Sequence, residues 1–363
     1  MSSSIGRMFV VTSFGESHGP CVGVVVDGCP AGVELDESLL ERDLARRRAA
    51  GQVGATPRAE PDVPRIICGV FKGKTTGAPI CMMVENVNAR SEAYLGVSDT
   101  PRPGHADYVA REKYGGLNDP RGGGRFSGRI TAGFVLAGTV AREALRAIGI
   151  DVFAHTTAIG GISASVPSLQ EARDAALLNE LSCADSDAAS RMKEAILRAS
   201  SEGDSVGGVV ETVATGVPVG LGEPVFDGAE SVLAHALYSI PAVKGVEFGA
   251  GFAVAGMRGS RSNDPYTVRG DCISTAKNDA GGILGGITHG MPVVARVAIK
   301  PTASIAVEQE TVRLSTHTAE KIAIAGRHDA CIVPRAVVVI ESMMAIGLCD
   351  LALCAGVMPR VVR

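Results

Sequence analysis

The chain has 363 residues, of which 46% are hydrophobic and 20% charged, so it can bury a sizeable core and is not an intrinsically disordered chain. Lys and Arg total 35 against 39 for Asp and Glu, and the net charge of −4 argues against a protein that binds nucleic acid over its whole surface. Glycine occupies 45 positions and aromatic residues only 4%, which favours close approach of the backbone to a ligand over stacking on aromatic rings.

The cysteines and the apolar stretches bear on where the protein works. Nine cysteines with no CxxC pair indicate free thiols in a reducing compartment. No positively charged segment followed by an apolar run begins the chain, so we expect no secretory signal. Residues 336–358 form the longest apolar stretch, but Glu341 and Asp350 interrupt it, which favours a buried helix over a membrane span. The sequence therefore predicts a cytoplasmic protein.

The first third of the chain predicts strands, one helix and long loops. The strands are expected over 9–14, 23–27, 65–71 and 79–84, and the helix over 36–50, capped by Asp36. Arg46, Arg47 and Arg48 near the helix end suit the helix dipole, yet three consecutive side chains point in three directions, so one or two could face a cleft. Residues 86–125 have almost no apolar periodicity, and we expect a long functional or disordered loop there.

The rest of the chain predicts a strong helix over 127–148, short amphipathic helices over 167–203 and a strand from residue 207. Residues 208–221 repeat the pattern of residues 23–33, a strand and a Pro/Gly turn before a helix. This repeat predicts an internal duplication, with halves of about 1–200 and 201–363. No Pro/Ser-rich linker separates the halves, so we expect one large domain over residues 1–363.

Two glycine-flanked histidines are candidates for proton transfer. His18 lies in the segment GESHG at 15–19, where a purely structural turn histidine is an equal alternative. His105 lies in RPGHAD at 102–107, two residues before Asp107, a carboxylate near enough in sequence to orient an imidazole. Metal binding by His18, His105 and Asp107 is conceivable, but no ligand spacing specifies it.

Cations cluster in the remaining glycine-rich segments. Three glycines at 122–124 precede a predicted helix and form a candidate anion cradle, with charge added by Arg121, Arg125 and Arg129. An RNA-binding RGG tract is the alternative, but such tracts repeat in low-complexity tails and this one occurs once.

Lys300 with Thr302 and Ser304 forms a candidate phosphate clamp. Arg327 and Asp329 flank His328, whose role stays open. Together these residues indicate an enzyme for a small, multiply anionic substrate such as a phosphorylated carboxylic acid. They leave open the reaction and the need for a phosphate-bearing cofactor.

Six segments of this chain resemble the chorismate synthase family, in order and over about residues 6–350. They are GESHG at 15–19, RPGHAD at 102–107, RGGGRFSGR at 121–129, SIPAVKGVEFG at 239–249, NDAGGILGG at 278–286 and GRHDACIVPRA at 326–336. The resemblance implies an α+β fold, a β-α-β sandwich with internal pseudo-twofold duplication and helices packed between antiparallel sheets. It also implies a cytoplasmic homotetramer that acts in the shikimate pathway to aromatic amino acids. The reaction would be the 1,4-elimination of phosphate from 5-enolpyruvylshikimate 3-phosphate to chorismate, which needs reduced FMN without net redox change.

The resemblance also implies roles for individual residues. His18 would be the acid that assists departure of the phosphate, His105 would stand against the reduced flavin, and Asp329 would help the flavin N5 region receive the C6 proton. Substrate contacts would come from Ser17, Arg47, Arg129 and Arg327. FMN contacts would come from Arg125, Phe126, Ser127, Pro241, Ala242, Gly285, Lys300, Pro301, Thr302, Ala303, Ser304 and Arg327.

The chain departs from the family pattern after its three arginines. Val53 stands where members often have another Arg, Ala49 where they have Pro, and Ala303 where Ser is frequent. Either Arg48 or Arg58 compensates for Val53, or the substrate is bound more weakly.

Bifunctional relatives reduce their flavin with NADPH, and the region of Arg47 is the candidate NADPH contact. No separate dinucleotide fold is evident here, so we expect an external flavin reductase. Two rival functions remain: an ordinary flavin oxidoreductase and a non-catalytic anion- or RNA-binding protein.

Overall fold

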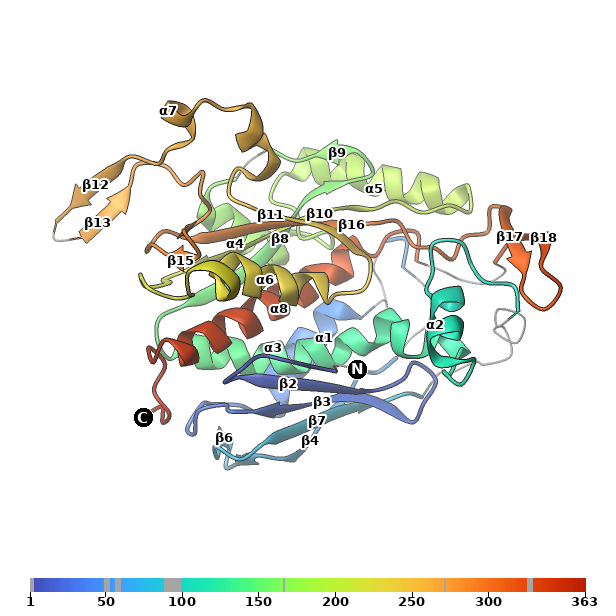
Figure 1. Ribbon diagram of the computed structural model, residues 1–363, viewed down its shortest axis with the longest axis horizontal. Helices are drawn as coiled ribbons and strands as arrows, with labels where there is room; N and C mark the ends of the chain where they lie inside the picture. Colours follow the sequence, from blue (N-terminus) through green and yellow to red (C-terminus); the bar gives the residue numbers. More distant parts are fainter. Residues whose placement is uncertain are drawn as a thin grey trace.

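Two five-stranded antiparallel sheets face each other across a layer of helices in the computed structural model (Figure 1). The structure describes residues 3–48, 53–55, 60–87, 99–165, 167–270, 272–324 and 329–363. The first sheet has the order β1-β2-β3-β7-β4 and the second β11-β16-β10-β8-β9. The strands of the first sheet are β1 (Ser4–Ile5), β2 (Val10–Gly15), β3 (Cys21–Asp27), β7 (Ile80–Glu85) and β4 (Pro64–Cys68). Those of the second are β11 (Val243–Phe248), β16 (Val293–Ile299), β10 (Gly208–Thr215), β8 (Asp151–Ile159) and β9 (Ile162–Ser163).

In each sheet, buried side chains alternate with less buried ones along a strand, so that one face of the sheet packs against the helices. Along β16, Val293, Ala295, Val297 and Ile299 are buried while the residues between them are only partly buried. In β7 the same alternation buries Ile80, Met82 and Val84, as expected for a strand whose side chains point to opposite faces in turn. These apolar faces of the two sheets belong to one continuous core.

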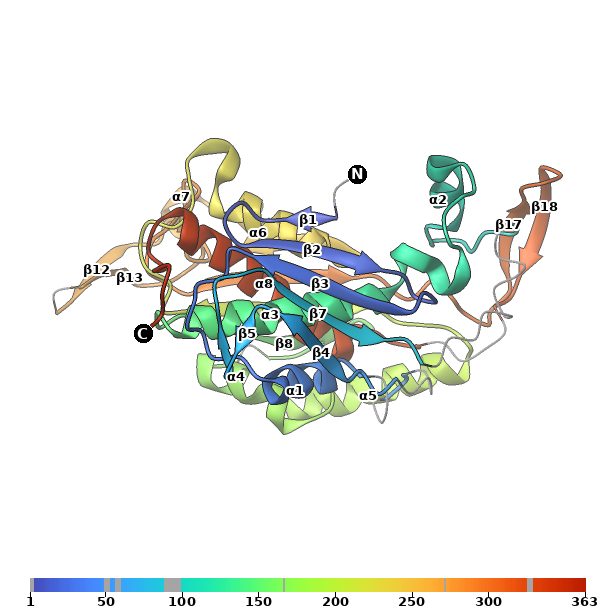
Figure 2. The same ribbon diagram turned by 90° about the horizontal axis from the view of Figure 1, so that it is seen from below.

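Four helices form the layer between the sheets: α1 (Glu37–Arg47), α3 (Thr131–Arg146), α6 (Ala229–Tyr238) and α8 (Val333–Cys354) (Figure 2). Helix α3 packs on β3 and α8 packs on β8 and β10, and the two helices contact each other along their length. Gly138 of α3 allows this close approach, because a Cβ there would overlap the side chain of Ser342 on α8.

Helix α8 is apolar and long enough to cross a membrane, yet 94% of its most apolar window is buried inside the protein. Its two acidic residues have partners in the core. Asp350 accepts the backbone N–H groups of Arg7, Met8 and Phe9 at 2.6–2.9 Å, and Glu341 binds Arg46. The prediction of a buried core helix is therefore confirmed, and these bonds explain how the helix tolerates two carboxylates.

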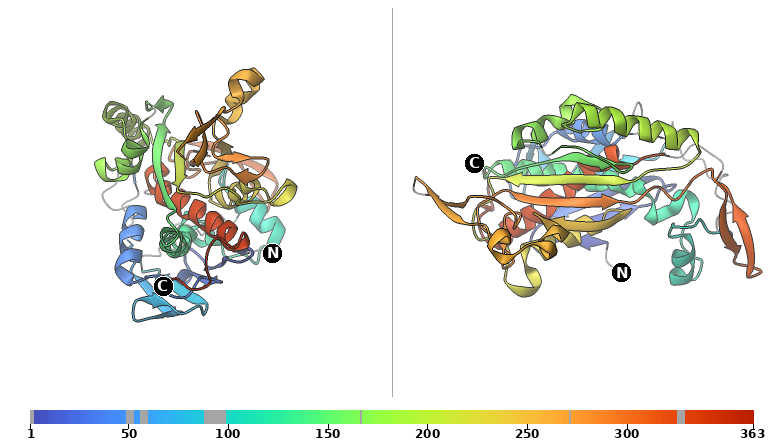
Figure 3. Two further views of the ribbon diagram at one scale, coloured as in Figure 1. Left: turned by 90° about the vertical axis from the view of Figure 1, so that its left-hand side faces the viewer. Right: turned by 90° about the horizontal axis from the view of Figure 1, so that it is seen from above.

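The remaining elements lie outside the sandwich (Figure 3). Helix α4 (Leu169–Leu178) covers the outer face of β8, and α5 (Ser186–Ser201) packs on β8 and β9. Two hairpins project at opposite ends of the long axis, β12 (Tyr266–Arg269) with β13 (Cys272–Thr275), and β17 (Gln309–Arg313) with β18 (Thr318–Ile322) (Figure 1). The other elements are β5 (Val70–Phe71), β6 (Lys74–Thr75), β14 (Ile283–Leu284), β15 (Ile287–Thr288), α2 (Asp107–Tyr114), α7 (Gly259–Ser262) and short 3-10 turns at 121–126, 128–130, 225–227 and 251–256.

The predicted fold class, helices between antiparallel sheets in an α+β protein, is confirmed. The Asp36 cap is also confirmed, since its carboxylate accepts the Leu39 N–H at 3.1 Å. Three local predictions were wrong. The helix expected from residue 127 begins at Thr131, after a 3-10 turn, and the long loop contains α2. The strand expected over 65–71 is interrupted at Gly69, and its parts β4 and β5 pair with different strands. The sequence pattern did not predict α2, because a helix that buries only one residue, Ala110, has no apolar stripe at helical spacing.

Candidate functional site

The turn between β2 and β3 packs against the glycine loop of residues 122–124. Ser17 and His18 in this turn are 1% and 8% exposed, and the Ser17 N–H donates to the Gly124 carbonyl at 3.2 Å. Gly122 has a φ of 58°, and a Cβ there would overlap the His18 ring and lie 2.8 Å from Ser17 Oγ. A glycine is therefore needed at residue 122 both for its backbone conformation and to leave room for His18.

His105 lies against the next residue of the same loop. A Cβ on Gly123 would lie 3.2–3.3 Å from the His105 ring, and the φ of Gly123 is 82°. His105 Nδ1 is 2.6 Å from a carboxylate oxygen of Asp107, the pairing that the spacing predicted. Consecutive glycines thus bring together the two histidines that sequence reasoning selected, although 87 residues separate them in the chain.

Arg102 anchors this pair and was not singled out by its sequence pattern. Its Nε and Nη2 donate to the two oxygens of Asp107 at 2.7 Å each, and its Nη1 donates to Ser304 Oγ at 3.0 Å. Burial alone would raise the pKa of Asp107, but the hydrogen bonds from Arg102 and His105 outweigh it and hold that pKa well below its ordinary value. Asp107 is therefore a fixed anion that orients His105. We call Ser17, His18, Arg102, His105 and Asp107 the histidine cluster.

Residues 300–304, which follow β16, connect this cluster to the rest of the site. Lys300 Nζ donates to the Gly104 carbonyl, and the Lys300 N–H donates to Ala242 O at 3.0 Å. Thr302 Oγ1 donates to the Asp329 carbonyl at 2.7 Å. The structure therefore brings seven predicted cofactor residues to this end of β16: Pro241 and Ala242 lie beside Lys300, and Pro301, Thr302, Ala303 and Ser304 belong to the same segment.

A second group lies at the ends of α1 and α3, and we call Arg47, Asp62, Arg129, Asp329 and Arg335 the arginine cluster. Asp62 is 2% exposed and its carboxylate binds both Arg47 and Arg129, each with a side chain 5% exposed. Arg335 donates to Asp329 Oδ2 at 2.6 Å and to the Arg47 carbonyl at 3.0 Å. Three guanidinium groups thus face two carboxylates in this described set. Burial, followed by the Arg335 charge, lowers the pKa of Arg47 to about 9, so this place favours further negative charge.

The two clusters are joined through Asn86 at the end of β7. Arg129 Nε donates to Asn86 Oδ1 at 2.8 Å, and Asn86 Nδ2 donates to the carbonyls of Glu16 and Gly19 at 3.0 and 2.8 Å. Asn86 therefore ties the arginine cluster to the turn that holds His18. It stood outside the selected motifs, and one amide in a long polar loop carries no signal of this role.

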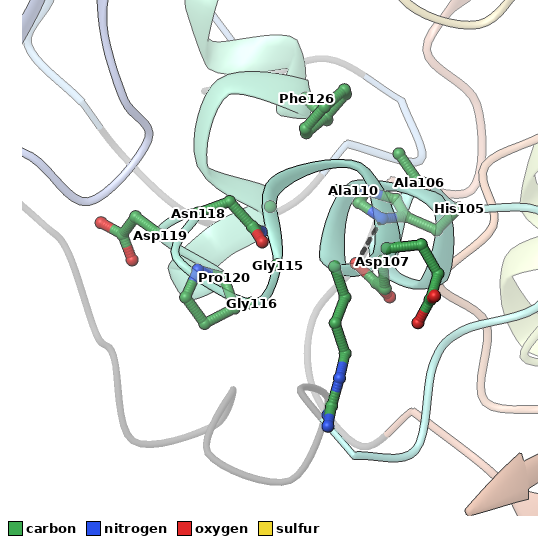
Figure 4. Close-up of a pocket in the computed structure, with 13 residues that line it drawn as sticks. His105, Ala106, Asp107, Ala110, Gly115, Gly116, Asn118, Asp119, Pro120 and Phe126 are labelled. Carbon is green, nitrogen blue, oxygen red and sulfur yellow. Dashed lines mark hydrogen bonds and ion pairs between the residues drawn. The ribbon is translucent and has the colours of Figure 1, made fainter. Parts of the chain in front are cut away.

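Of the predicted residues 125–127, Phe126 lines a cavity of about 390 Å³ beside α2 (Figure 4). The Phe126 ring, His105, Asp107 and Gly123 line it. Arg125 does not point freely into solvent, because it donates to Ser13 O at 2.7 Å and Ser13 Oγ at 3.1 Å. Ser127 accepts the Arg129 N–H and so caps the 3-10 turn before α3.

Among the described residues, one predicted site residue lies apart from this arrangement. Gly285 lies in the turn between β14 and β15, and these strands lie at the opposite end of the molecule from α2 (Figure 1). Arg327 and the undecided His328 lie outside the described residues. Among the described residues no group of three or more His, Cys, Asp and Glu side chains is placed to hold a metal ion, so the weak metal hypothesis gains no support.

The arrangement can bind anions and move protons. Buried guanidinium groups in excess of carboxylates attract an anionic ligand, and Ser17 Oγ is buried without a hydrogen-bond partner in the described part of the chain. Two imidazoles lie against the adjacent cradle of glycines, one of them oriented by a carboxylate. This fold and site define an α+β protein of the kind that handles small anionic substrates.

Comparison with known proteins identifies the family. The family model for chorismate synthase matches residues 9–353, and the chain belongs to that family. It is 51% identical over 363 residues, all of both chains, to a chorismate synthase of Dehalococcoides mccartyi (strain BAV1). It is 52% identical over 345 residues to one of Korarchaeum cryptofilum, covering 95% of this chain and 96% of that one. A solved chorismate synthase structure superposes with a TM-score of 0.74 and 29% identity, covering 96% of this chain and 92% of that chain.

Proposed function

We propose that this protein converts 5-enolpyruvylshikimate 3-phosphate to chorismate by 1,4-elimination of phosphate, a carbon–oxygen lyase reaction of the shikimate pathway. The observation that carries the proposal is the packing of His18 and His105 against consecutive glycines beside a buried excess of guanidinium groups. The substrate bears a phosphate and two carboxylates, and the reaction releases one of these anions while a proton leaves C6. The site supplies cations and proton carriers of that kind.

The residues of the site divide this chemistry between them. Arg47 and Arg129 hold anionic groups of the substrate, together with Ser17, whose buried hydroxyl is left to donate. His18, beside Ser17, protonates the phosphate as it leaves. Asp329, fixed by Arg335, directs the C6 proton. Arg327, by the same family resemblance, is the third cationic contact with the substrate.

The residues present fit reduced FMN. Phe126, Gly123 and His105 line the cavity, and Lys300 donates to the carbonyl of Gly104, the residue before His105. Burial and the neighbouring charge of Lys244 lower the pKa of Lys300, so an anionic phosphate there would be favourable. When bound, reduced FMN supplies an electron-rich ring that lends charge while the phosphate leaves. Contacts from one chain would come from Arg125, Phe126, Ser127, Pro241, Ala242, Lys300, Pro301, Thr302, Ala303, Ser304 and Arg327.

We further propose a cytoplasmic homotetramer formed from one duplicated domain, supplied with reduced flavin by a separate reductase. A bifunctional enzyme that uses NADPH at Arg47 is the alternative.

Anaerobic incubation with 5-enolpyruvylshikimate 3-phosphate and dithionite-reduced FMN tests the proposal. Chorismate and inorganic phosphate should appear in equal amounts while the flavin stays reduced. Oxidation of one flavin for each product molecule would identify an ordinary flavin oxidoreductase. Absence of product, with anion affinity that falls steeply with salt and ignores flavin, would identify the non-catalytic binding protein. Chorismate formation with NADPH and oxidised FMN alone would show the bifunctional form.

A further inference from the structure

Asp62 lies inside the arginine cluster as its resident counter-ion. Its carboxylate reaches from Arg47 Nη1, at 3.3 Å, to Arg129 Nη1. Both guanidinium groups are buried and would otherwise be uncompensated charges. One carboxylate thus occupies the position between two arginines at which the site would hold an anionic group of a ligand.

The remaining hydrogen bonds show that the arginines are held in place without Asp62. Arg47 also donates to Thr131 Oγ1 and to the Gly128 carbonyl, both at 2.8 Å. Arg129 also donates to Asn86 Oδ1 at 2.8 Å and to the Glu85 carbonyl at 3.0 Å. These neutral acceptors fix the direction of each guanidinium group, so another oxyanion could take the place of the carboxylate without the arginines moving.

The backbone of Asp62 is in the left-handed region, with a φ of 44°. Asp, Asn and Gly accept this conformation more readily than other residues. The Arg48 guanidinium also donates to the Asp62 carbonyl, at 3.4 Å, and so supports the same turn. Asp62→Asn and Asp62→Gly can therefore remove the charge while keeping the local chain path.

We propose that Asp62 occupies the anion subsite between Arg47 and Arg129 in the ligand-free protein and is displaced by an oxyanion of the substrate. Only the identity of that oxyanion, a phosphate or a carboxylate, rests on the proposed function. Asp62 is then a specificity-determining residue. A ligand must bind the two arginines better than the resident carboxylate does, which discriminates against weakly bound anions and favours polyanions.

Binding of inorganic phosphate and of malonate by the full chain tests the exchange, at constant ionic strength and with no flavin or substrate. Calorimetric titration should show that Asp62→Asn binds at least one of the two anions about tenfold or more tightly than the wild type, because no carboxylate competes. The anion whose affinity increases more, phosphate or malonate, shows whether the subsite binds a phosphate or a carboxylate group of the substrate. Equal or weaker binding of both anions by Asp62→Asn would overturn the proposal.

Thermal unfolding gives a second readout with a matched control. Without phosphate, Asp62→Asn should melt below the wild type, and added phosphate should raise its melting temperature more than that of the wild type. Asp43→Asn is the control, because Asp43 is also a buried carboxylate, bonded to Arg142, but lies in the core. It should be destabilised without any added response to phosphate. An equal phosphate response in the two variants would contradict the exchange.

Asp62→Gly keeps the test decisive if Asp62→Asn does not fold. Folding of either variant in phosphate but not in chloride would support the exchange. Failure of both variants to fold at saturating phosphate would overturn it, since an external oxyanion would then be unable to replace the carboxylate. These readouts need no turnover, so a failure of the proposed reaction leaves them interpretable.

Discussion

Arg46 and Arg47 are neighbours on α1, yet they enter two buried ion clusters of different character. Arg46 donates to both oxygens of Glu341 on α8 at 2.8 Å, and Arg142 of α3 links Glu341 to Asp43. In this core cluster Arg42, Arg46 and Arg142 meet the two buried carboxylates, but the Arg42 and Arg46 side chains are 50% and 29% exposed and only Arg142 is buried. Arg47 enters the arginine cluster, where three guanidinium groups meet two carboxylates and the histidine cluster lies alongside.

The difference shows how a structural ion cluster is told from a ligand site. Water screens the partly exposed cations of the core cluster, whereas Arg47 and Arg129 are each 5% exposed and share one carboxylate, so their surplus charge is unfavourable until an anion joins it. Burial lowers the pKa of Arg46 to about 10, and burial with the added Arg335 charge lowers that of Arg47 to about 9. Substitutions in the site should therefore change activity, whereas substitutions in the core cluster should change stability.

The largest expected effect is on turnover at the histidine cluster. His18→Ala and His105→Ala should each lower kcat by about 10²–10⁴-fold, the usual contribution of a positioned proton donor or acceptor. Steady-state kinetics with reduced FMN measures this. His155→Ala is the control, because His155 is 1% exposed on β8, pairs with Glu211 at 3.1 Å and lies outside the site. Full activity of either site variant would remove that histidine from the mechanism.

The next effect is on stability at the core cluster. Glu341→Gln leaves Arg46 and Arg142 without their shared carboxylate in a buried place. The free energy of unfolding should fall by about 3–5 kcal/mol, as for other buried pairs that lose one partner. Denaturant titration measures the loss, and phosphate should not restore it. A loss below about 1 kcal/mol would show that the core cluster is not the structural element we describe.

A smaller effect is expected at the carboxylate that orients His105. Asp107→Asn should lower kcat by about 10–100-fold with little change in KM, because the imidazole loses its orienting partner. The folded-state pKa of Asp107 lies below its unfolded value of about 3.9, so its contribution to stability is present above about pH 4 and is lost as the pH falls further. The pH profile of kcat above pH 5 should therefore not contain this group. An unchanged kcat in Asp107→Asn would contradict the orienting role.

The smallest effect concerns the cation that this chain lacks. Val53 packs partly buried against the core, and the next residue, Gly54, accepts the Ala330 N–H at 2.7 Å, beside Asp329. Val53→Arg should add a cation near the arginine cluster and lower KM by up to about fivefold, the scale of a partly screened ion pair. Val53→Gln is the control for size. An equal or higher KM in Val53→Arg would show that Arg48, or Arg58 outside the described residues, already compensates.

Much of the site was predictable because its signals are local. Glycines next to one another, a histidine two residues from a carboxylate, and arginines beside a helix end are short-range patterns, and the described glycines 122–124 all have a positive φ. Gly285 shows the limit of such reasoning. The resemblance assigned it to the flavin, but within one chain it lies at the other end of the molecule.

By itself, the sequence determined the alternation of strands, the Asp36 cap, the buried character of α8 and the family motifs, all of which depend on near neighbours in the chain. Only the tertiary structure decided that Arg46 joins the core while Arg47 joins the site, and that Asp62, Arg102 and Arg335 neutralise their neighbours. The physical reason is that a buried charge is defined by the groups that surround it. Those groups come from segments as far apart as residues 47 and 335, whose meeting no local pattern encodes.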